Sequence, residues 1–423
     1  MLQVSYIRDN REQVLERLAV KNFKQPLLVD EIIELDDKRR QTQTALDNVS
    51  AQANAAAKQI GELMRAGKKE EAETLKLKTA VWKENIKELG RQLTDVEEEL
   101  QQKLVLLPNL PHRSVPRGLI PEDNEVVLEN GVKPALPANA LPHWELAAKY
   151  NLIDFELGVK ITGAGFPVYK DKGAKLQRAL ISFFLDEAEK AGYNEVMLPL
   201  MVNEASGFGT GQLPDKEGQM YFVGNDNLYL IPTAEVPITN MYRDVILKAE
   251  ELPVKNCGYT PCFRREAGSY GAHVRGLNRL HQFDKVEIVQ VVHPDHSYKV
   301  HQQMCLHVQS LLEKLGLPYR VLRLCGGDMS FASALTYDME TWSAAQQRWL
   351  EVSSVSNFET FQSNRLKLRF RNAEGKTQLA HTLNGSALAL PRIVATLLEN
   401  NQTENGIKIP EVLVPYTKFE WIN

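Results

Sequence analysis

The residues best suited to chemistry lie in one cationic stretch between two predicted strands. Arg264 and Glu266 end the first strand, and Phe283 begins the second, which runs to residue 291 with alternating apolar and polar residues. A hairpin normally turns in about two to five residues, so the long loop over residues 267–280 serves something beyond the turn. An arginine grips phosphate, a carboxylate accepts from an exocyclic amine, and an aromatic ring stacks on a base. The set could hold a nucleotide, although an isolated Arg-x-Glu is usually a surface ion pair.

Two further polar motifs could bind small ligands. Prolines bracket Thr233, Ala234 and Glu235, which fixes a loop able to present a hydroxyl and a carboxylate. The alternative is a turn whose threonine caps the following helix. Farther along, Glu351 and Ser354 end a predicted strand, and their oxygen atoms suit Mg²⁺, which binds ATP by bridging its phosphates.

The first hundred residues predict a helical arm. Short, locally packed helices precede residue 30, and apolar residues then recur at spacings of three and four over 32–63 and 72–100. Two such seams joined at Gly67 predict an antiparallel coiled-coil hairpin over about residues 30–100. At about 1.5 Å per residue each helix is roughly 45 to 50 Å long, so we expect the hairpin to project. Its distal half is rich in lysine and arginine, although a solvated coiled-coil surface would also explain that charge.

Prolines mark the end of this arm. Three of them fall within residues 107–116, where they exclude a helix interior, so we predict domains at 1–103 and 104–423. Beyond residue 150, strands outnumber helices and are joined by hairpins, and no Gly-rich phosphate loop occurs. This predicts an α+β fold with an antiparallel sheet flanked by helices rather than a Rossmann fold. The alternating basic residues of 364–371 predict another strand with a solvated basic face, although that face could instead meet an RNA backbone.

Composition limits the class of protein. A net charge of −4 over 423 residues gives no global attraction to nucleic acid, so RNA contacts must come from local patches. The four cysteines form neither a CxxC pair nor a disulfide framework, the N-terminus is polar, and no apolar run reaches about eighteen residues. We expect a soluble, cytoplasmic protein that binds neither membranes nor DNA.

The stretch 259–290 resembles motif 2 of class II aminoacyl-tRNA synthetases. Phe-Arg-Arg-Glu-Ala-Gly-Ser (263–269), Arg-Gly-Leu (275–277) and His-Gln-Phe-Asp-Lys-Val-Glu (281–287) are similar to the form seen in bacterial-type seryl-tRNA synthetases. The resemblance extends through the arm and through 209–214, 233–235, 351–354 and 384–386, which together cover nearly the whole chain. Residues 384–399 resemble motif 3, but Ala387 and Pro391 stand where the family usually has glycines, which leaves the backbone shape near the adenine in question.

The resemblance implies a serine–tRNA ligase that makes seryl-adenylate from L-serine and ATP and then charges tRNA(Ser), with tRNA(Sec) as a further acceptor. It implies a homodimer through motif 1, the helix and strand of 173–199. The serine-binding residues it implies are Thr233, Ala234, Glu235, Arg264, Glu287, Asn384 and Ser386. The ATP-binding residues are Arg264, Arg265, Glu266, Phe283, Glu351, Val352, Ser353, Ser354 and Arg392, with Mg²⁺ on Glu351 and Ser354 and catalytic roles for Arg264, Glu351 and Arg392. The tRNA-binding residues are Lys58, Arg65, Lys68, Lys69, Lys76 and Arg275.

Two alternatives remain at this point. The first is a class II relative that adenylates an amino acid and loads a carrier other than tRNA, for which a long RNA-reaching arm would have no use. The second is a non-catalytic, RNA-binding coiled-coil scaffold, which would have no need of Arg264, Glu266, Glu351 and Arg392.

Overall fold

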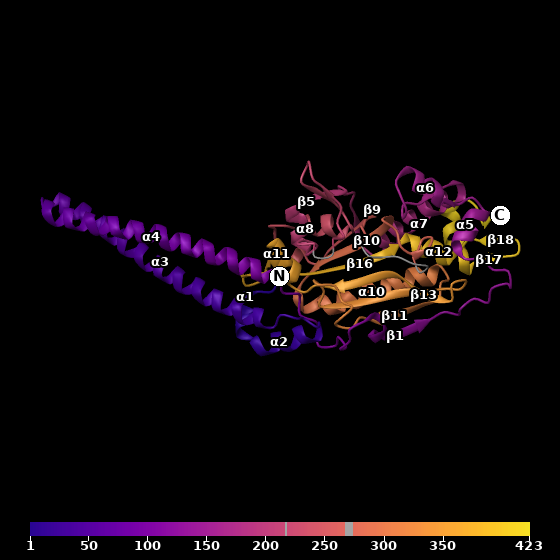
Figure 1. The fold of residues 1–423 in the computed structure, drawn as a ribbon, viewed down its shortest axis with the longest axis horizontal. Coiled ribbons are helices and arrows are strands. Elements are labelled where there is room, and N and C mark those ends of the chain that lie inside the picture. Colours follow the sequence, from indigo (N-terminus) through magenta and orange to yellow (C-terminus); the bar gives the residue numbers. More distant parts are fainter. Residues whose placement is uncertain (216–217, 267–273) are drawn as a thin grey trace. The chain divides into compact units, whose positions relative to one another are not determined.

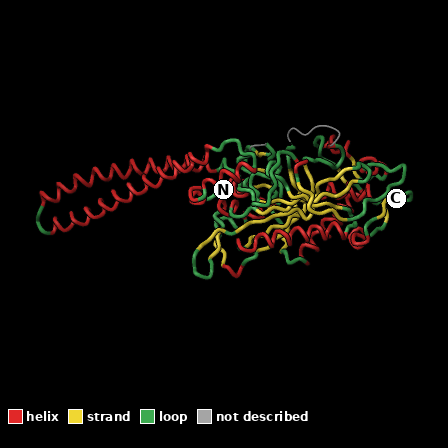
Figure 2. The backbone as a smooth tube through the Cα atoms, turned by 90° about the horizontal axis from the view of Figure 1, so that it is seen from below, coloured by secondary structure: helices red, strands yellow, loops and turns green. Residues whose placement is uncertain are grey.

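Two long helices dominate the N-terminal part of the chain (Figure 1). In this computed structural model, which describes residues 1–215, 218–266 and 274–423, the short helices α1 (Val4–Asp9) and α2 (Arg11–Val20) are followed by α3 (Leu27–Arg65) and α4 (Lys69–Leu104). The two long helices run side by side (Figure 2), and Gly67 between them has a φ of 75°. Alanines 53, 56 and 72 are buried along the seam, as the heptad pattern requires. The coiled-coil prediction is confirmed.

The chain divides into two compact units. The N-terminal unit contains Met1–Ala19 and Phe23–Pro108, and the C-terminal unit contains Val20–Asn22 and Asn109–Asn423. At the base of the hairpin, within the N-terminal unit, Arg8 and Arg39 both pair with the buried Asp36. No helix in the described ranges is long and apolar enough to cross a membrane.

An eight-stranded sheet forms the centre of the C-terminal unit (Figure 1). Its strands, in spatial order, are β1 (Glu125–Asn130), β11 (Tyr319–Arg323), β12 (Leu335–Ser343), β13 (Arg348–Asn357), β16 (His381–Ala389), β10 (Gln282–Val292), β9 (Val254–Phe263) and β4 (Asn194–Glu195). Every neighbouring pair is antiparallel except β4 and β9. The predicted antiparallel α+β fold is confirmed.

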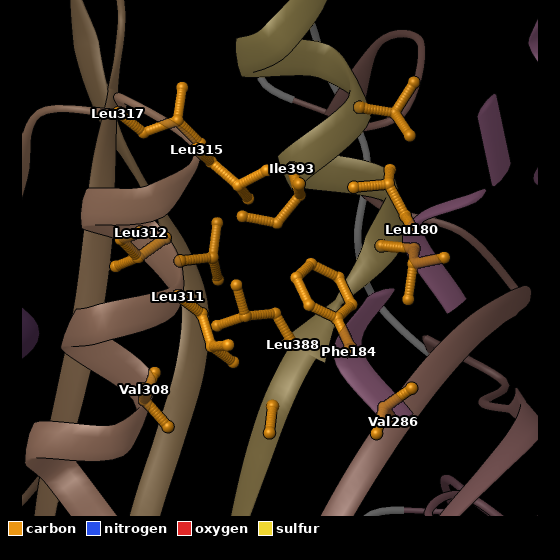
Figure 3. Packing of buried hydrophobic residues seen from close by; sticks show 14 of the residues in the cluster. Leu180, Phe184, Val286, Val308, Leu311, Leu312, Leu315, Leu317, Leu388 and Ile393 are labelled. Atoms are coloured by element: carbon orange, nitrogen blue, oxygen red, sulfur yellow. The ribbon is translucent and has the colours of Figure 1, made fainter. Parts of the chain in front are cut away.

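Three helices supply most of the core on one face of this sheet. These are α7 (Asp171–Lys190), α10 (Ser297–Lys314) and α12 (Leu390–Asn400), and all three contribute to a single buried hydrophobic cluster. Figure 3 shows Phe184 of α7, Leu311 of α10 and Ile393 of α12 meeting over Leu388 of β16. Val286 and Ile288 of β10 belong to the same cluster, so the even-numbered side chains at this point of β10 face the helices. The odd-numbered ones are left for the opposite face.

Shorter elements surround the sheet. The helices are α5 (His143–Lys149), α6 (Phe155–Ile161), α8 (Glu204–Thr210), α9 (Glu235–Asn240), α11 (Phe361–Leu366) and α13 (Val414–Thr417). One small sheet consists of β2 (Ile153–Asp154) and β3 (Val168–Tyr169), and another of β5 (Met201–Asn203), β6 (Phe222–Val223) and β7 (Leu228–Leu230). A further sheet consists of β8 (Ile246–Lys248), β14 (Arg369–Arg371) and β15 (Thr377–Leu379). The strands β17 (Gln402–Thr403), β18 (Gly406–Lys408) and β19 (Trp421–Ile422) form another.

The predicted strand over 364–371 is wrong in its first half. Residues 364–366 end helix α11, and only Arg369–Arg371 form a strand. The alternating charge misled the prediction because Arg365 is buried, not solvated. Its Nη1 atom donates to the carbonyl oxygens of Phe208 at 3.1 Å and Leu213 at 3.0 Å.

Candidate active site

The predicted hairpin around Arg264 is formed by β9 and β10. These strands pair from Phe263 opposite Gln282 to Val254 opposite Val291. Arg264 follows the end of β9, its Nε atom donates to the carbonyl oxygen of Pro232 at 3.3 Å, and its guanidinium carbon lies 5.3 Å from the centre of the Phe283 ring. The hairpin therefore brings two predicted ATP-binding residues together beside the loop that carries Thr233. Residues 267–273 of the predicted long loop lie outside the described residues.

Arg265 and Glu266 have different surroundings. Arg265 is exposed, and its backbone N–H donates to the carbonyl oxygen of Gln219 at 2.9 Å. Glu266 has a φ of 47° and forms an ion pair with Arg279. It also lines a cavity of about 810 Å³ together with Arg275, whose guanidinium carbon lies 4.8 Å from the Trp144 ring centre. A nucleotide amine at Glu266 would therefore meet a carboxylate that already has a cationic partner.

Five of the predicted serine-binding side chains form one buried polar cluster, which is called the pocket from here on. Thr233, Glu235, Glu287, Asn384 and Ser386 are all less than 9% exposed. The pairing of β10 with β16 accounts for three of them, because Glu287 is the register partner of Ser386, and Asn384 that of Val289. The Ser386 hydroxyl lies 3.4 Å from the Glu287 carboxylate. Glu287 is on the face of β10 opposite the helices, a position that its sequence pattern alone did not decide.

Lys285 is a pocket residue that the sequence analysis missed. Its Nζ atom lies 2.5 Å from Glu287 Oε2 and donates to the Thr233 hydroxyl at 2.8 Å, and its side chain is only 6% exposed. The same hydroxyl accepts from the backbone N–H of Glu235 at 3.2 Å, a local turn bond, whereas the N-cap of α9 is Ala234 and has no side-chain capping bond. The signal was its position two residues before Glu287, because alternate residues of a strand share a face.

Glu235 has an unusual electrostatic position. Burial and the neighbouring charge of Glu287 raise the pKa of its carboxyl to about 7, although a hydrogen bond from Gln362 opposes the shift. The Gln362 Nε2 atom donates to Glu235 Oε1 at 2.6 Å. The pocket therefore holds two carboxylates and one lysine, and its net charge changes near neutral pH.

Three predicted ligand-binding residues point their side chains elsewhere. Ala234 and Val352 are buried in hydrophobic clusters. The hydroxyl of Ser353 donates to the carbonyl oxygen of Ser386 at 2.5 Å. Only the backbone atoms of Ala234 and Val352 are left to contact a ligand.

Arg392 lies in the first turn of α12, directly after β16. Its Nε atom donates to the carbonyl oxygen of Asn278 at 3.0 Å, and its Nη1 atom donates to the carbonyl oxygen of Glu351 at 2.8 Å. Pro391 occupies the first turn, where a missing N–H costs nothing, so it is compatible with the start of the helix. Ala387 is fully buried in the core.

Glu351 and Ser354 lie on β13 opposite two acidic residues of β12. On β12, Glu340 is the register partner of Glu351, and Asp338 that of Ser354. Burial, followed by the charge of Glu351, raises the pKa of Asp338 well above its ordinary value, and its Oδ1 atom is buried with no hydrogen-bond partner in the described part of the chain. Clustered oxygen ligands of this kind fit Mg²⁺. No group of three His, Cys, Asp or Glu side chains able to hold a metal occurs among the described residues.

The predicted tRNA-binding residues of the hairpin surround its tip. Lys58, Arg65, Lys68, Lys69 and Lys76 are all exposed. Lys68 pairs with Glu71 at 2.9 Å and Lys76 with Glu73 at 2.5 Å, both as local pairs on α4 or at its start. Exposed pairs of this kind contribute little to stability, so the cations can exchange these partners for phosphates.

The hairpin β9–β10, the strand β13 and the strand–helix unit β16–α12 form the catalytic core of a class II aminoacyl-tRNA synthetase. Residues 221–401 match the family model described as the tRNA synthetase class II core domain (G, H, P, S and T). Residues 1–111 match the model described as the seryl-tRNA synthetase N-terminal domain.

Full-length relatives narrow this class. A serine–tRNA ligase of Salinibacter ruber is 52% identical over 421 residues, which is 99% of this chain and 98% of that relative. The crystal structure of seryl-tRNA synthetase from Pyrococcus horikoshii complexed with ATP has a TM-score of 0.93 and 32% identity, covering 100% of this chain and 99% of the other. A cytoplasmic serine–tRNA ligase from Naegleria fowleri in complex with AMP has a TM-score of 0.89 and 25% identity, with the same coverage. The chain belongs to the seryl-tRNA synthetase family.

Proposed function

We propose that the protein is a serine–tRNA ligase. It activates L-serine with ATP to seryl-adenylate and pyrophosphate, and then transfers the seryl group to the 3′-terminal ribose hydroxyl of tRNA(Ser). The proposal is supported by family membership, by the similarity to the serine–tRNA ligase of Salinibacter ruber and by the similarity to the ATP complex of the Pyrococcus horikoshii enzyme.

The observation that carries the proposal is the buried pocket beside Arg264. It offers hydroxyls from Thr233 and Ser386 and carboxylates from Glu235 and Glu287 within one small, desolvated space. A cationic amine that leaves water needs a carboxylate partner, and a substrate hydroxyl needs fixed polar partners. Serine is a small substrate that presents both groups.

The adenylation step asks little covalent chemistry of the protein. A serine carboxylate oxygen attacks the α-phosphorus of ATP, a new P–O bond forms, and the bond to the leaving pyrophosphate breaks. Arg264 and Arg392 hold the phosphates in line and neutralise the charge that builds on their oxygens. Mg²⁺ held by Glu351 and Ser354 would add to that neutralisation when bound. None of the nine histidines is assigned a general-base role.

The remaining proposed roles concern the binding of the adenine base and the phosphates of ATP. Glu266 accepts from the adenine amine, Phe283 stacks on the base, and Arg265 lies near the phosphates, with backbone contributions from residues 351–354. The Arg264 guanidinium carbon lies 5.3 Å from the centre of the Phe283 ring, so the two residues are close enough to contact one nucleotide.

The two units take separate roles in this proposal. Residues 1–103 bind tRNA through Lys58, Arg65, Lys68, Lys69 and Lys76, and residues 104–423 carry catalysis, with Arg275 near the acceptor end. Clustered exposed cations are the usual footprint of phosphate-backbone binding. We include tRNA(Sec) as a second acceptor and a cytoplasmic location for the enzyme.

We further propose a homodimer formed through the segment that follows α7. Strand β4 lies at one edge of the eight-stranded sheet, and Met197, two residues after it, is 96% exposed while Val196 and Leu198 pack inward. A large apolar side chain held out at a sheet edge is typical of an association surface.

ATP–pyrophosphate exchange with a panel of amino acids tests the proposed function. We expect serine-dependent exchange, with alanine rejected by about 10⁴ or more, because a pocket that hydrogen-bonds a hydroxyl leaves its polar groups unpaired around alanine. Equal exchange with alanine or threonine would refute the assignment to serine. Exchange without tRNA charging would favour a ligase for another carrier, and no exchange at all would favour a scaffold.

A further inference from the structure

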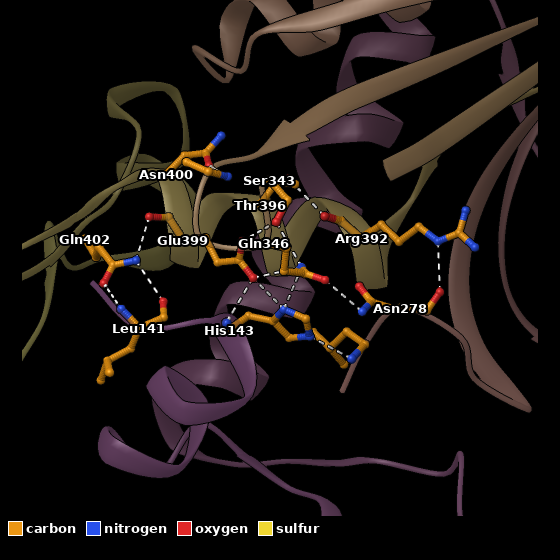
Figure 4. Close-up of polar contacts among 12 residues, drawn as sticks. Leu141, His143, Asn278, Ser343, Gln346, Arg392, Thr396, Glu399, Asn400 and Gln402 are labelled. Carbon is orange, nitrogen blue, oxygen red and sulfur yellow. Dashed lines mark hydrogen bonds and ion pairs between the residues drawn. The ribbon is translucent and has the colours of Figure 1, made fainter. Parts of the chain in front are cut away.

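A buried hydrogen-bond network connects α12, the helix that carries Arg392, to residues 277–278 (Figure 4). The carbonyl oxygen of Asn278 accepts a hydrogen bond from that arginine. At its centre is His143, the first residue of α5, whose side chain is fully buried, as is that of Glu399 on α12. The His143 Nδ1 atom lies 2.7 Å from Glu399 Oε1. The backbone N–H of Leu277 donates to His143 Nε2 at 2.9 Å.

These two bonds determine the state of the imidazole. A backbone N–H can only donate, so Nε2 must present its lone pair to Leu277, and the ring proton must be on Nδ1. Burial alone would raise the pKa of Glu399, but hydrogen bonds from His143 and Ser343 lower it below its ordinary value, so this carboxylate is ionised and accepts. Both ring nitrogen atoms of His143 are therefore engaged in hydrogen bonds.

Gln346 provides a second connection between the same two segments. Its Nε2 atom donates to Glu399 Oε1 at 2.9 Å, and its Oε1 atom accepts from Asn278 Nδ2 at 2.9 Å. Two routes from Glu399 thus reach adjacent residues, one through His143 to the Leu277 backbone and one through Gln346 to the Asn278 side chain. Figure 4 shows His143 and Gln346 lying side by side between Glu399 and Asn278.

The network closes on Arg392. The carbonyl oxygen of Asn278 accepts from Arg392 Nε at 3.0 Å, and Arg392 lies on the same helix as Glu399, about two turns earlier. The helix that carries the arginine is therefore fastened, through Glu399, to the segment whose carbonyl group orients that arginine. A displacement of Leu277 and Asn278 would change the direction of the guanidinium.

Gly276 shows how closely this segment packs on the imidazole. Its φ is 67°, and a Cβ atom added there would lie 2.3 Å from His143 Nε2. Only glycine fits both the backbone conformation and the space, so the approach of 276–278 to the ring is fixed by close packing as well as by the hydrogen bond.

We propose that His143 is a positioning residue for the adenylation reaction. It holds the segment 276–278 so that the Asn278 carbonyl group orients Arg392. The inference rests on the proposed function, because the role of Arg392 at ATP is itself proposed. The His143 side chain is fully buried, and its effect passes through Arg392.

Two substitutions of His143 separate its two bonds. In His143→Asn the shorter side chain can still donate to Glu399 but cannot reach Leu277, whereas in His143→Gln an amide oxygen can take the place of Nε2. A misplacement of about 1 Å can cost about a hundredfold, so we expect His143→Asn to lower kcat for serine-dependent ATP–pyrophosphate exchange ten- to hundredfold. The KM for serine should stay within about twofold, and His143→Gln should recover much of the loss. The control is His307→Asn on α10, another poorly exposed histidine, whose Nε2 atom is buried with no hydrogen-bond partner among the described residues.

A double-mutant cycle with Arg392→Ala makes the test specific. If His143 acts through Arg392, adding His143→Asn to Arg392→Ala should reduce exchange by less than about threefold further. Full additivity, or near-normal kcat in His143→Asn alone, would overturn the inference. Should His143→Asn fail to fold, Gln346→Met cuts the second route and must show the same non-additivity, and its absence would equally overturn the inference.

The exchange reaction of the unmodified chain separates this inference from the proposed function. A full chain inactive with serine would refute the proposed function, and the cycle would then be read with whichever amino acid the enzyme activates. Serine-dependent exchange that is indifferent to His143 would refute the inference alone.

Discussion

The hairpin and the pocket use charge in opposite ways. The basic residues near the hairpin tip are exposed on a two-helix unit that buries its own apolar seam. In the pocket, Lys285 and Glu287 of strand β10 are buried and paired with each other. Glu235, at the start of α9 and far away in sequence, is also buried and accepts a hydrogen bond from Gln362. Exposed cations suit a large, hydrated polyanion that is bound to the protein through many weak contacts. Buried, paired charges suit a small ligand that must be stripped of water and discriminated from similar molecules.

Removing most of the hairpin should produce the largest effect. We expect a chain in which residues 40–91 are replaced by a short Gly-Ser turn to charge tRNA(Ser) slower by about three orders of magnitude. The reason is that all the distal lysines and arginines are lost together and phosphate contacts act collectively. Aminoacylation with labelled serine measures this. Charging at a nearly normal rate would make the hairpin a structural or oligomerisation element.

Arg264→Lys should produce the next largest effect. It should slow serine activation and leave tRNA binding by the hairpin unchanged. Lysine keeps the charge but not the planar fork, so transition-state contacts worth about 3 kcal/mol are lost and exchange should slow at least a hundredfold. The KM for serine should change little. Arg371→Lys, an exposed arginine of β14, is the matched control. Near-normal exchange by Arg264→Lys would contradict a contact of Arg264 with the α-phosphate of ATP.

The elements that the sequence predicted are those whose pattern is local. The seams of α3 and α4 repeat within a few residues, and the strands β9 and β10 flank a single loop, so periodicity alone places them. The pairing of Lys285 with Glu287 follows the period of two and was available in principle. The contacts of His143 could not be predicted in this way, because they join residues that are separated by 134 and by 256 positions in the sequence. The burial of Arg365 was missed for a related reason. Its charge indicated a solvent-exposed side chain, but the carbonyl groups that accept its hydrogen bonds come from a distant helix and loop.

Serine affinity should depend on pH through Glu235. Its pKa in the folded protein is raised from 4.5 to about 7, so the folded chain holds a proton over this interval that the unfolded chain releases. Its stabilising contribution is therefore present below pH 4.5 and lost as the pH rises through about 7. In the proposed function the ionised carboxylate binds serine, and with a pKa of about 7 its ionised fraction falls about tenfold from pH 8 to pH 6. We therefore expect the KM for serine to rise about tenfold over this interval. Glu235→Gln should abolish this dependence, and a flat profile in the unmodified enzyme would exclude Glu235 from serine binding.

Single cations of the hairpin should produce the smallest effects. Lys69→Ala should weaken tRNA binding a few-fold and reduce the slope of log affinity against log salt by about one, while exchange stays unchanged. Lys103→Ala is the control, because its amine pairs with Glu31 at 2.7 Å at the opposite end of α4. Equal losses in the two variants would contradict a binding site near the tip.

The most direct test of the separation between hairpin and pocket is serine activation by the chain that lacks residues 40–91. Every residue assigned to ATP or serine lies outside the deleted segment. Serine-dependent ATP–pyrophosphate exchange, measured beside the full chain at saturating substrates, should therefore stay within a few-fold of normal. A folded, shortened chain that had lost exchange would contradict the account, because the pocket would then depend on the hairpin for its chemistry.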